Sequence, residues 1–505
     1  MKTHTRVAVV ALLSSAWAAA ALAGPLQDDL RARRGRVMER LGPETLLIVW
    51  GGRSTADPDR EEPAAENLYY LTGTTQADSI LVLMPGNETK KELLFVRPFN
   101  AVSEHREGHS LTQKEAAERT GIDAVFTLDQ FERFIEATFS RRAFRTERPG
   151  ASAPPGDKPA EPTAFFTALE QNRARLALVL GRRSLAEPLN KPLEFANRLR
   201  ERFDGFTLLD ASEIVHGLRQ VKTTFEQGIL RRSLEISNEA HMAGMRAAAP
   251  GRHEYEVESA IEAVYLKNGA MKPGYDSIVG SGPNGTVLHY NESGRKMEAG
   301  DLLLVDAAGS YQGYTGDITR TYPVSGTFTP AQKEIYEIVL AAQEAGIKAA
   351  TSGRRTSDIT DACADVIKKG LLRLGLITDA SGDQYRVWAT HGPVHWIGLH
   401  VHDVGVTNVL APGMAFVIEP GIYIREQALD TMPATKENLA FIEKVRPVVK
   451  KYLNTGVRIE DSFLLTPTGL ERLSAPVPRT IAEIESFMRT QSPKTSAPGG
   501  SGSAR

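Results

Sequence analysis

Four carboxylates and one imidazole in the second half of the chain lie in or beside apolar, strand-like segments. Asp306 closes the apolar run 302–305, and Glu419 closes the apolar run 414–418. An ionised carboxylate in such a strand costs several kcal/mol unless a partner offsets its desolvation. The chain therefore needs a fold that gathers these groups around a shared partner, and two divalent cations could be that partner. The five residues are Asp306, Asp317, His395, Glu419 and Glu460.

The chemistry of this set narrows the choice of metal. It is hard and rich in oxygen, and it contains no thiolate, which favours Mn, Co, Fe or Zn over a sulfur-bound structural zinc. A single Asp or Glu beside Gly or Pro is more often a turn or cap residue, so no member is informative alone. The set as a whole favours a metal site, because Gly or Pro lies close to nearly every member. His289, His391 and His402 add nearby side chains that titrate near neutrality.

The length of 505 residues favours two sizeable domains, since one core rarely grows so large. From Glu44 to about Leu209, short apolar runs such as 46–50 and 80–84 alternate with amphipathic stretches, which predicts an α/β domain. Thr223 and Glu226 form a capping box that opens a long helix through about Ala248. Helices near 254–268, 330–350 and 356–374 then separate β-rich segments near 275–325 and 413–466, which predicts an α+β second domain.

The N-terminus predicts export. Lys2 and Arg6 precede the apolar run 7–22, and Ala21-Leu22-Ala23 supplies the small residues that a signal peptidase needs. An uncleaved anchor is the alternative, although the run is short for a span of ~20 residues. We therefore expect a signal peptide over 1–23, a periplasmic or secreted mature protein, and no stable membrane insertion after cleavage. The expected domains are 24–215 and 216–490, with a disordered tail over 491–505 and a flexible loop over 148–162.

Composition limits the partners. Hydrophobic residues make up 41% and charged residues 24%, which is typical of a soluble globular protein. The chain has 60 Lys and Arg residues against 62 Asp and Glu residues, so it lacks the basic surplus that nucleic-acid binding requires. Cys363 is the only cysteine, so the monomer can form no internal disulfide. Its surroundings predict a helix, and we expect a buried structural thiol there.

Several ordered motifs resemble the creatinase and methionine aminopeptidase superfamily with its "pita-bread" fold, and within it the aminopeptidase P and prolidase family. The stretches that carry the resemblance are 278–282, 288–290, 313–321, 391–403, 419–421 and 458–461, with 218–222 at the domain junction and 69–73 in the first domain. The resemblance implies an α+β fold with a C-terminal pita-bread metallopeptidase domain. It also implies a preceding α/β creatinase-like domain and, as is usual in the family, a homodimer or homotetramer.

The resemblance also implies roles for single residues. Asp306 would chelate one metal, His395 and Glu419 the other, and Asp317 and Glu460 would bridge the pair, most simply of Mn²⁺, with Co²⁺, Zn²⁺ or Fe²⁺ as alternatives. A hydroxide held between the metals would attack the bond before proline in proline-containing peptides. The implied supporting residues are His289 and His402 at the oxyanion, His391 at the proline pocket, Glu419 as proton shuttle, and Tyr423 and Arg458 on the pocket side.

Rival functions remain open at this point. Creatinase-like members of the superfamily lack the metals, but all five ligand positions are filled here. The large N-terminal domain disfavours a methionine aminopeptidase, and an exported peptide-binding protein with a vestigial site is the non-enzymatic alternative.

A dipeptide-specific prolidase usually binds the carboxylate that follows proline with an Arg. In the prolidases of higher organisms that the chain resembles, one such Arg comes from a long loop between the positions of His402 and Glu419. The corresponding segment here, 403–418, is short and contains no Lys or Arg. We therefore expect an aminopeptidase that accepts tripeptides and longer chains. The long insertion between Glu419 and Glu460 and the ending 477–481 are more similar to prolidases, and Arg425 or a residue of the N-terminal domain could supply the cation for dipeptide specificity.

Overall fold

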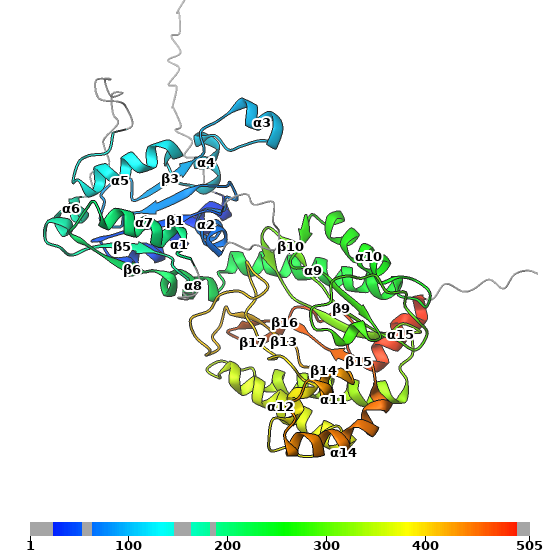
Figure 1. Ribbon diagram of the computed structural model, residues 1–505. Coiled ribbons are helices and arrows are strands. Elements are labelled where there is room, and N and C mark those ends of the chain that lie inside the picture. Colours follow the sequence, from blue (N-terminus) through cyan, green and yellow to red (C-terminus); the bar gives the residue numbers. More distant parts are fainter. Residues whose placement is uncertain (1–23, 53–62, 146–162, 182–187, 492–505) are drawn as a thin grey trace, which may run out of the picture.

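The computed structural model describes residues 24–52, 63–145, 163–181 and 188–491, which form two domains (Figure 1). The predicted signal peptide, the predicted loop over 148–162 and residues 492–505 of the predicted tail lie outside these ranges. No helix within the described ranges is long and apolar enough to cross a membrane.

The N-terminal domain is built on a six-stranded mixed sheet in the order β4-β3-β2-β1-β5-β6. Helices cover both faces, and alternate residues of the central strand therefore enter different cores: Leu46 and Ile48 pack on one side, Leu47 and Val49 on the other. The elements are α1 (Pro25–Leu41), β1 (Thr45–Trp50), α2 (Pro63–Thr72), β2 (Ile80–Leu83), β3 (Glu92–Val96), α3 (Ala101–Glu107), α4 (Gln113–Thr120), β4 (Ala124–Thr127), α5 (Phe131–Phe139), α6 (Thr163–Glu170), β5 (Ala174–Leu178), α7 (Lys191–Arg200), β6 (Phe206–Asp210) and α8 (Ser212–Gln220). The predicted α/β character is confirmed.

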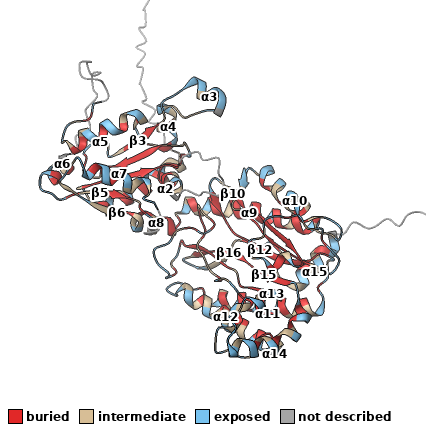
Figure 2. Ribbon diagram, in the orientation of Figure 1, coloured by how far each residue is buried: buried red, intermediate tan, exposed pale blue. Residues whose placement is uncertain are grey.

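The C-terminal domain places small antiparallel sheets among helices. Its elements are α9 (Thr224–Ala247), α10 (Glu254–Lys267), β7 (Lys272–Pro273), β8 (Ile278–Ser281), β9 (Leu302–Asp306), β10 (Gly309–Tyr311), β11 (Tyr314–Thr315), β12 (Thr319–Pro323), α11 (Pro330–Ala349), α12 (Thr356–Leu374), β13 (Ala415–Ile418), β14 (Gly421–Ile424), α13 (Gln427–Asp430), α14 (Lys436–Tyr452), β15 (Thr455–Arg458), β16 (Asp461–Thr466), β17 (Gly469–Arg472) and α15 (Ile481–Gln491). The strands are largely buried, whereas the outer faces of the helices are exposed (Figure 2).

Strand register brings the carboxylates toward one place. Asp306 at the end of β9 pairs with Thr319 at the start of β12, and Ile418 at the end of β13 pairs with Asp461 at the start of β16. The backbone N–H of Glu460 donates to the carbonyl of Thr319 at 3.0 Å, which joins the β9–β12 pair to the β13–β16 pair. The ends of four strands therefore meet at one site.

The predicted helix after residue 223 is confirmed as α9, including the capping box between Thr223 and Glu226. The other three predicted helices correspond to α10, α11 and α12. Cys363 lies on α12, is 1% exposed, and donates to the carbonyl of Ala342, and burial raises the pKa of its thiol to about 12. The expectation of a buried structural thiol is therefore met.

Two sequence expectations need correction. The segment 413–466 is β-rich only at its ends, because α14 occupies 17 residues between β14 and β15. Thr435 caps this helix, and its buried residues Phe441, Val445 and Val449 recur every four positions to pack on the core. In addition, a domain boundary between residues 215 and 216 falls inside α8, whose Leu218 belongs to the N-terminal core. We place the boundary just after α8.

Candidate metal centre

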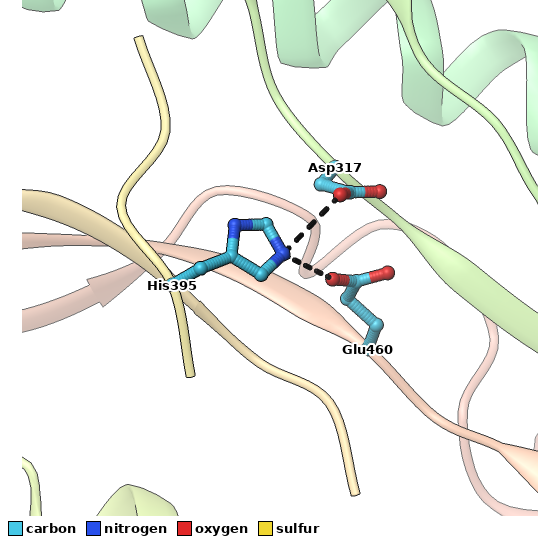
Figure 3. A group of neighbouring side chains, drawn as sticks. All are labelled: Asp317, His395 and Glu460. Atoms are coloured by element: carbon cyan, nitrogen blue, oxygen red, sulfur yellow. Dashed lines mark ion pairs between the residues drawn. The ribbon is translucent and has the colours of Figure 1, made fainter. Parts of the chain in front are cut away.

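All five residues that the sequence singles out lie in one place in the structure. The imidazole Nε2 of His395 lies 3.4 Å from Glu419 Oε1, 3.6 Å from Asp317 Oδ2 and 3.8 Å from Glu460 Oε1. One ligand atom each from Asp317, His395 and Glu460 lies within 4.8 Å of the other two (Figure 3). The three side chains come from the β11–β12 connection, the loop 390–403 and the β15–β16 connection, and all point toward one another.

Asp306 completes the group from the end of β9. The hydroxyl of Tyr275 lies between Asp306 and Asp317 and contacts an oxygen of each, at 2.7 Å for Asp306 Oδ1. The other oxygen of Asp306 accepts a hydrogen bond from Arg458 Nη2 at 2.6 Å. Asp306 and Asp317 are therefore held side by side, as two carboxylates that share a metal pair must be.

Glu460 has an oxygen without a donor. Its Oε2 accepts from the hydroxyl of Thr319 at 2.8 Å, whereas its buried Oε1 finds no hydrogen-bond partner among the described residues. Buried polar atoms are rarely left in this state, because the desolvation penalty is then not offset. An orphaned carboxylate oxygen that faces His395 and Asp317 fits a group of residues that could hold a cation.

The pKa values of the site also indicate that it has too little positive charge. Burial, and then the negative charge of Asp306, raises the pKa of Asp317 well above its ordinary value. Burial, and then the charges of Asp317 and Glu419, does the same to the pKa of Glu460. Burial opposes protonation of His395, but Glu419 and Glu460 outweigh it and raise the histidine pKa to about 9. Protein charges alone therefore leave the site short of positive charge.

Two members of the group are better compensated. Burial would raise the pKa of Asp306, but the charge of Arg458 more than offsets it and the pKa lies below its ordinary value. Burial would likewise raise the pKa of Glu419, but its hydrogen bond to His395 and the charge of His391 lower it. These two carboxylates stay ionised and available as ligands.

The predicted histidines surround the ligand group. The ring of His402 packs edge-on against that of His395, with centroids 4.5 Å apart. Burial, and then the positive charge of His395, lowers the pKa of His402, and exposed His289 lies near enough to contribute. His391 lies behind Glu419, with its Nδ1 3.6 Å from Glu419 Oε2.

Tyr423 and Arg458 lie deeper than a pocket wall. Both are nearly inaccessible, at 3% and 1% exposed. Arg458 Nη1 donates to the hydroxyl of Tyr423 at 2.8 Å, and that hydroxyl lies 2.8 Å from His391 Nε2. A continuous series of hydrogen bonds therefore connects Asp306 to His391 through Arg458 and Tyr423.

Sequence reasoning missed Tyr275 and Thr319. Tyr275 has a pKa well above its ordinary value, because it is buried and faces negative charge from Asp306 and Asp317. Thr319 receives a hydrogen bond from Arg458 Nε at 3.0 Å and donates to Glu460. Thr319 lies within the motif 313–321, but a neutral hydroxyl carries no pattern that distinguishes it from other strand residues.

The fold and the site define a metallopeptidase of the pita-bread type. Residues 228–467 match metallopeptidase family M24, and residues 30–145 match the aminopeptidase P N-terminal domain. The chain belongs to the aminopeptidase P and prolidase family within the M24 metallopeptidases.

Two of the similar proteins cover nearly the whole chain, and a third covers little more than half of it. The Xaa-Pro aminopeptidase of Escherichia coli K12 is 31% identical over 92% of this chain and 98% of its own length. The solved structure of aminopeptidase P from E. coli superimposes with a TM-score of 0.73, at 30% identity, over 92% of this chain and 98% of that one. Human Xaa-Pro dipeptidase is 33% identical, over 57% of this chain and 64% of its own length.

Proposed function

We propose that the chain is a metal-dependent Xaa-Pro aminopeptidase, which removes the first residue of a peptide whose second residue is proline. The convergence of four carboxylates and His395, with the orphaned Oε1 of Glu460 among them, is the observation that carries this proposal. Proline needs a dedicated enzyme because its amide lacks an N–H and its ring fixes φ, which excludes it from the extended binding mode of general peptidases.

The five residues would hold two divalent cations, with Asp306 on one, His395 and Glu419 on the other, and Asp317 and Glu460 between them. When bound, such a pair polarises the scissile carbonyl and lowers the pKa of water toward neutrality, which supplies a nucleophile. The oxygen-rich donor set supports Mn²⁺ as the metal, with Co²⁺, Zn²⁺ or Fe²⁺ as alternatives. One neighbouring structure is that of Zn-substituted E. coli aminopeptidase P in complex with product.

The histidines would act on the substrate directly. A lowered pKa leaves His402 neutral at pH 7, so one ring N–H is free to donate to the carbonyl oxygen as negative charge develops there. His289, exposed on the same side, would hold the substrate with it. Glu419 would pass a proton toward the leaving proline nitrogen, and its nearness to His391 keeps a second titratable group within reach.

Arg458 and Tyr423 would order the pocket side of the site from below its surface, because both are buried. Arg458 fixes the oxygen of Asp306 that it contacts, and Tyr423 fixes the ring of His391 through Nε2. His391 would then line the proline pocket in a single orientation, because its Nδ1 also lies 3.0 Å from the carbonyl of Gly392.

A metal-exchange experiment tests the proposal. The protein is dialysed against a chelator, assayed on an Xaa-Pro-Yaa peptide, reloaded with Mn²⁺ and assayed again, with release of the first residue followed by mass spectrometry. We expect turnover to vanish on chelation and to return on reloading, while the matched Xaa-Ala-Yaa peptide stays intact. Near-normal hydrolysis by the metal-stripped protein would sink the proposal.

The preferred length of the substrate distinguishes an Xaa-Pro aminopeptidase from an Xaa-Pro dipeptidase. We propose a preference for tripeptides and longer peptides, since no Lys or Arg between Asp403 and Ile418 is present to bind a free prolyl carboxylate. The similarity to human Xaa-Pro dipeptidase supports the rival reading, with Arg425 as its cation. The two activities are distinguished by comparing kcat/KM for an Xaa-Pro dipeptide with kcat/KM for its Xaa-Pro-Yaa extension. A higher value for the dipeptide would favour prolidase activity.

We also propose export and self-association. Export rests on the signal-peptide pattern in residues 1–23, which lie outside the described part of the chain. Mass spectrometry of the native protein should find a mature chain that begins near Gly24, in the periplasm or medium. Light scattering should find a homodimer or homotetramer, and an intact Met1 in a cytoplasmic fraction would contradict export.

A further inference from the structure

The junction between the domains buries three polar side chains within four residues. Arg219, Gln220 and Lys222 are each at most 2% exposed, although they lie where α8 ends and the second domain begins (Figure 1). Buried cations persist in proteins only when they are paired and hydrogen-bonded. All three side chains have partners in the segment 403–407, which starts immediately after His402.

Both oxygens of Asp403 are held by these cations. Arg219 Nη2 donates to Asp403 Oδ1 at 2.5 Å, and Lys222 Nζ donates to Asp403 Oδ2 at 3.1 Å. Burial would raise the pKa of Asp403, but the charges of Arg219 and Lys222 offset it and the pKa lies below its ordinary value. The backbone at residue 403 is therefore fixed to the junction by an ionised, doubly bonded carboxylate.

Gln220 holds the next turn of the same segment. Its Oε1 accepts from the backbone N–H groups of Val406 at 3.0 Å and Thr407 at 3.3 Å, and its Nε2 donates to the carbonyl of Thr407 at 2.7 Å. The side-chain amide thus replaces a strand partner for this stretch, so the chain that leaves His402 cannot shift without breaking these bonds.

The stretch before His402 is equally constrained. Gly398 packs against the carboxylate of Asp403, and a Cβ there would lie 2.1 Å from Asp403 Oδ2. The backbone N–H of Asp403 donates to the carbonyl of Trp396 at 2.9 Å, and the N–H of His402 donates to His400 Nδ1 at 2.9 Å. Asp403 is thus the point at which the His402 loop is anchored.

The same guanidinium reaches the N-terminal domain. Arg219 Nη1 donates to Asn67 Oδ1 at 2.8 Å, and Arg219 Nη2 also donates to Glu66 Oε2 at 2.5 Å. Both acceptors lie on α2. A single side chain therefore links a helix of the first domain to the residue that follows His402 in the second.

We propose that Arg219 is a positioning residue for His402, and that α2 supports its orientation through Glu66 and Asn67. The N-terminal domain then contributes to turnover without touching the substrate. The inference rests on the proposed role of His402 in holding the reacting carbonyl. It explains why the junction motif at residues 218–222 carries buried charge where an ordinary linker would be solvated.

Glu66→Gln is the variant of choice, because it removes one charge at the rim of the network and leaves Asn67, Arg219 and Asp403 in place. We expect kcat on an Xaa-Pro-Yaa peptide to fall about 10-fold, the scale of losses at residues that orient a functional group, with KM changed far less. Glu92→Gln is the matched control, since Glu92 likewise partners a buried arginine, Arg34, but away from His402. It should leave kcat unchanged.

Two measurements decide the inference. In a His402→Asn background, Glu66→Gln should cause no further loss, because the group that it orients is already gone. Hydrogen exchange of backbone amides in 398–407 should speed up in Glu66→Gln and not in Glu92→Gln, independently of activity. Equal losses in both backgrounds, or unchanged exchange in Glu66→Gln, would overturn the inference. If His402→Asn alone keeps full turnover, the proposed role of His402 fails, and exchange alone decides whether Arg219 positions the loop.

Discussion

Two clusters of buried charge adjoin His402, and they differ in how their charges balance. At the proposed metal centre, Asp306, Asp317, Glu419 and Glu460 gather around His395, and Arg458 contributes a permanent positive charge through its ion pair with Asp306. At the junction, Arg219 and Lys222 face Asp403 and Glu66, two cations for two carboxylates. Both clusters are inside the protein, where unpaired charge is costly.

The difference separates a structural cluster from a binding site. At the junction the carboxylate of Asp403 has a lowered pKa and both of its oxygens are bonded, so the network is complete with protein groups alone. At the metal centre, Asp317 and Glu460 have raised pKa values and one oxygen of Glu460 has no donor. The uncompensated negative charge therefore supports the proposed cation site at Asp317 and Glu460.

Removal of a metal ligand should give the largest effect. His395→Ala, Asp317→Ala or Glu460→Ala should each lower turnover on the order of 10³-fold or more, the scale seen when one member of a cooperating catalytic group is lost. The fold should persist, because each change removes a ligand and no core side chain. Initial rates with saturating Mn²⁺, beside circular dichroism, check this. Retention of near-normal rates would contradict the ligand assignment.

The two clusters should respond oppositely to neutralisation. In metal-free protein, Asp403→Asn should lower the free energy of unfolding by about 3 kcal/mol, because it leaves buried Arg219 and Lys222 poorly compensated. Asp317→Asn should leave that free energy unchanged or raise it, because it relieves repulsion with Asp306. Urea titrations in the presence of a chelator measure both. Equal destabilisation by the two variants would break the comparison.

Metal affinity should depend on pH in a way that junction stability does not. His395 has a pKa of about 9 without metal, so it is protonated at pH 7 and must lose that proton to bind. Affinity should therefore fall about tenfold per pH unit below 9 for this group alone. The pKa of Asp403 lies below its ordinary value of 3.8, so the stability that its ionised form contributes is fully present above pH 3.8. That stability is lost only as the pH falls through the lowered pKa.

Calorimetry in two buffers of different ionisation enthalpy gives the number of protons released when Mn²⁺ binds the metal-free protein. We expect at least one proton at pH 7, and more if Asp317 and Glu460 are also protonated before binding. Release of no protons would show that His395, Asp317 and Glu460 are already deprotonated before Mn²⁺ binds. The raised pKa values that distinguish the metal centre from the junction would then be wrong.

The smallest effect should come from a balanced pair that is not buried. Asp365 and Lys369 form an exposed i,i+4 pair on α12, with an oxygen–nitrogen distance of 2.6 Å and side chains 60% and 71% exposed. Asp365→Asn should change the free energy of unfolding by no more than about 0.5 kcal/mol. A loss near that of Asp403→Asn would mean that burial does not set the value of a charge pair here.

The elements that sequence reasoning found are those with a local cause. The helix α9 carries its own capping box at Thr223 and Glu226, and the strand before Asp306 is an uninterrupted apolar run. The helix α14 was missed because it lies between strands whose apolar runs suggested a continuous sheet. Its helical spacing of Phe441, Val445 and Val449 was present in the sequence but was outweighed by its flanks.

The sequence by itself singled out the groups that gather at the proposed metal site, because a carboxylate that ends an apolar strand needs a partner wherever the strand lies. It also determined the two-domain division and the absence of any internal disulfide. Only the tertiary structure decided that Tyr275 lies between Asp306 and Asp317, and that Arg219 joins α2 to Asp403. These contacts join residues up to 184 positions apart. Such partners are set by how sheets and domains pack, and no local pattern encodes that distance.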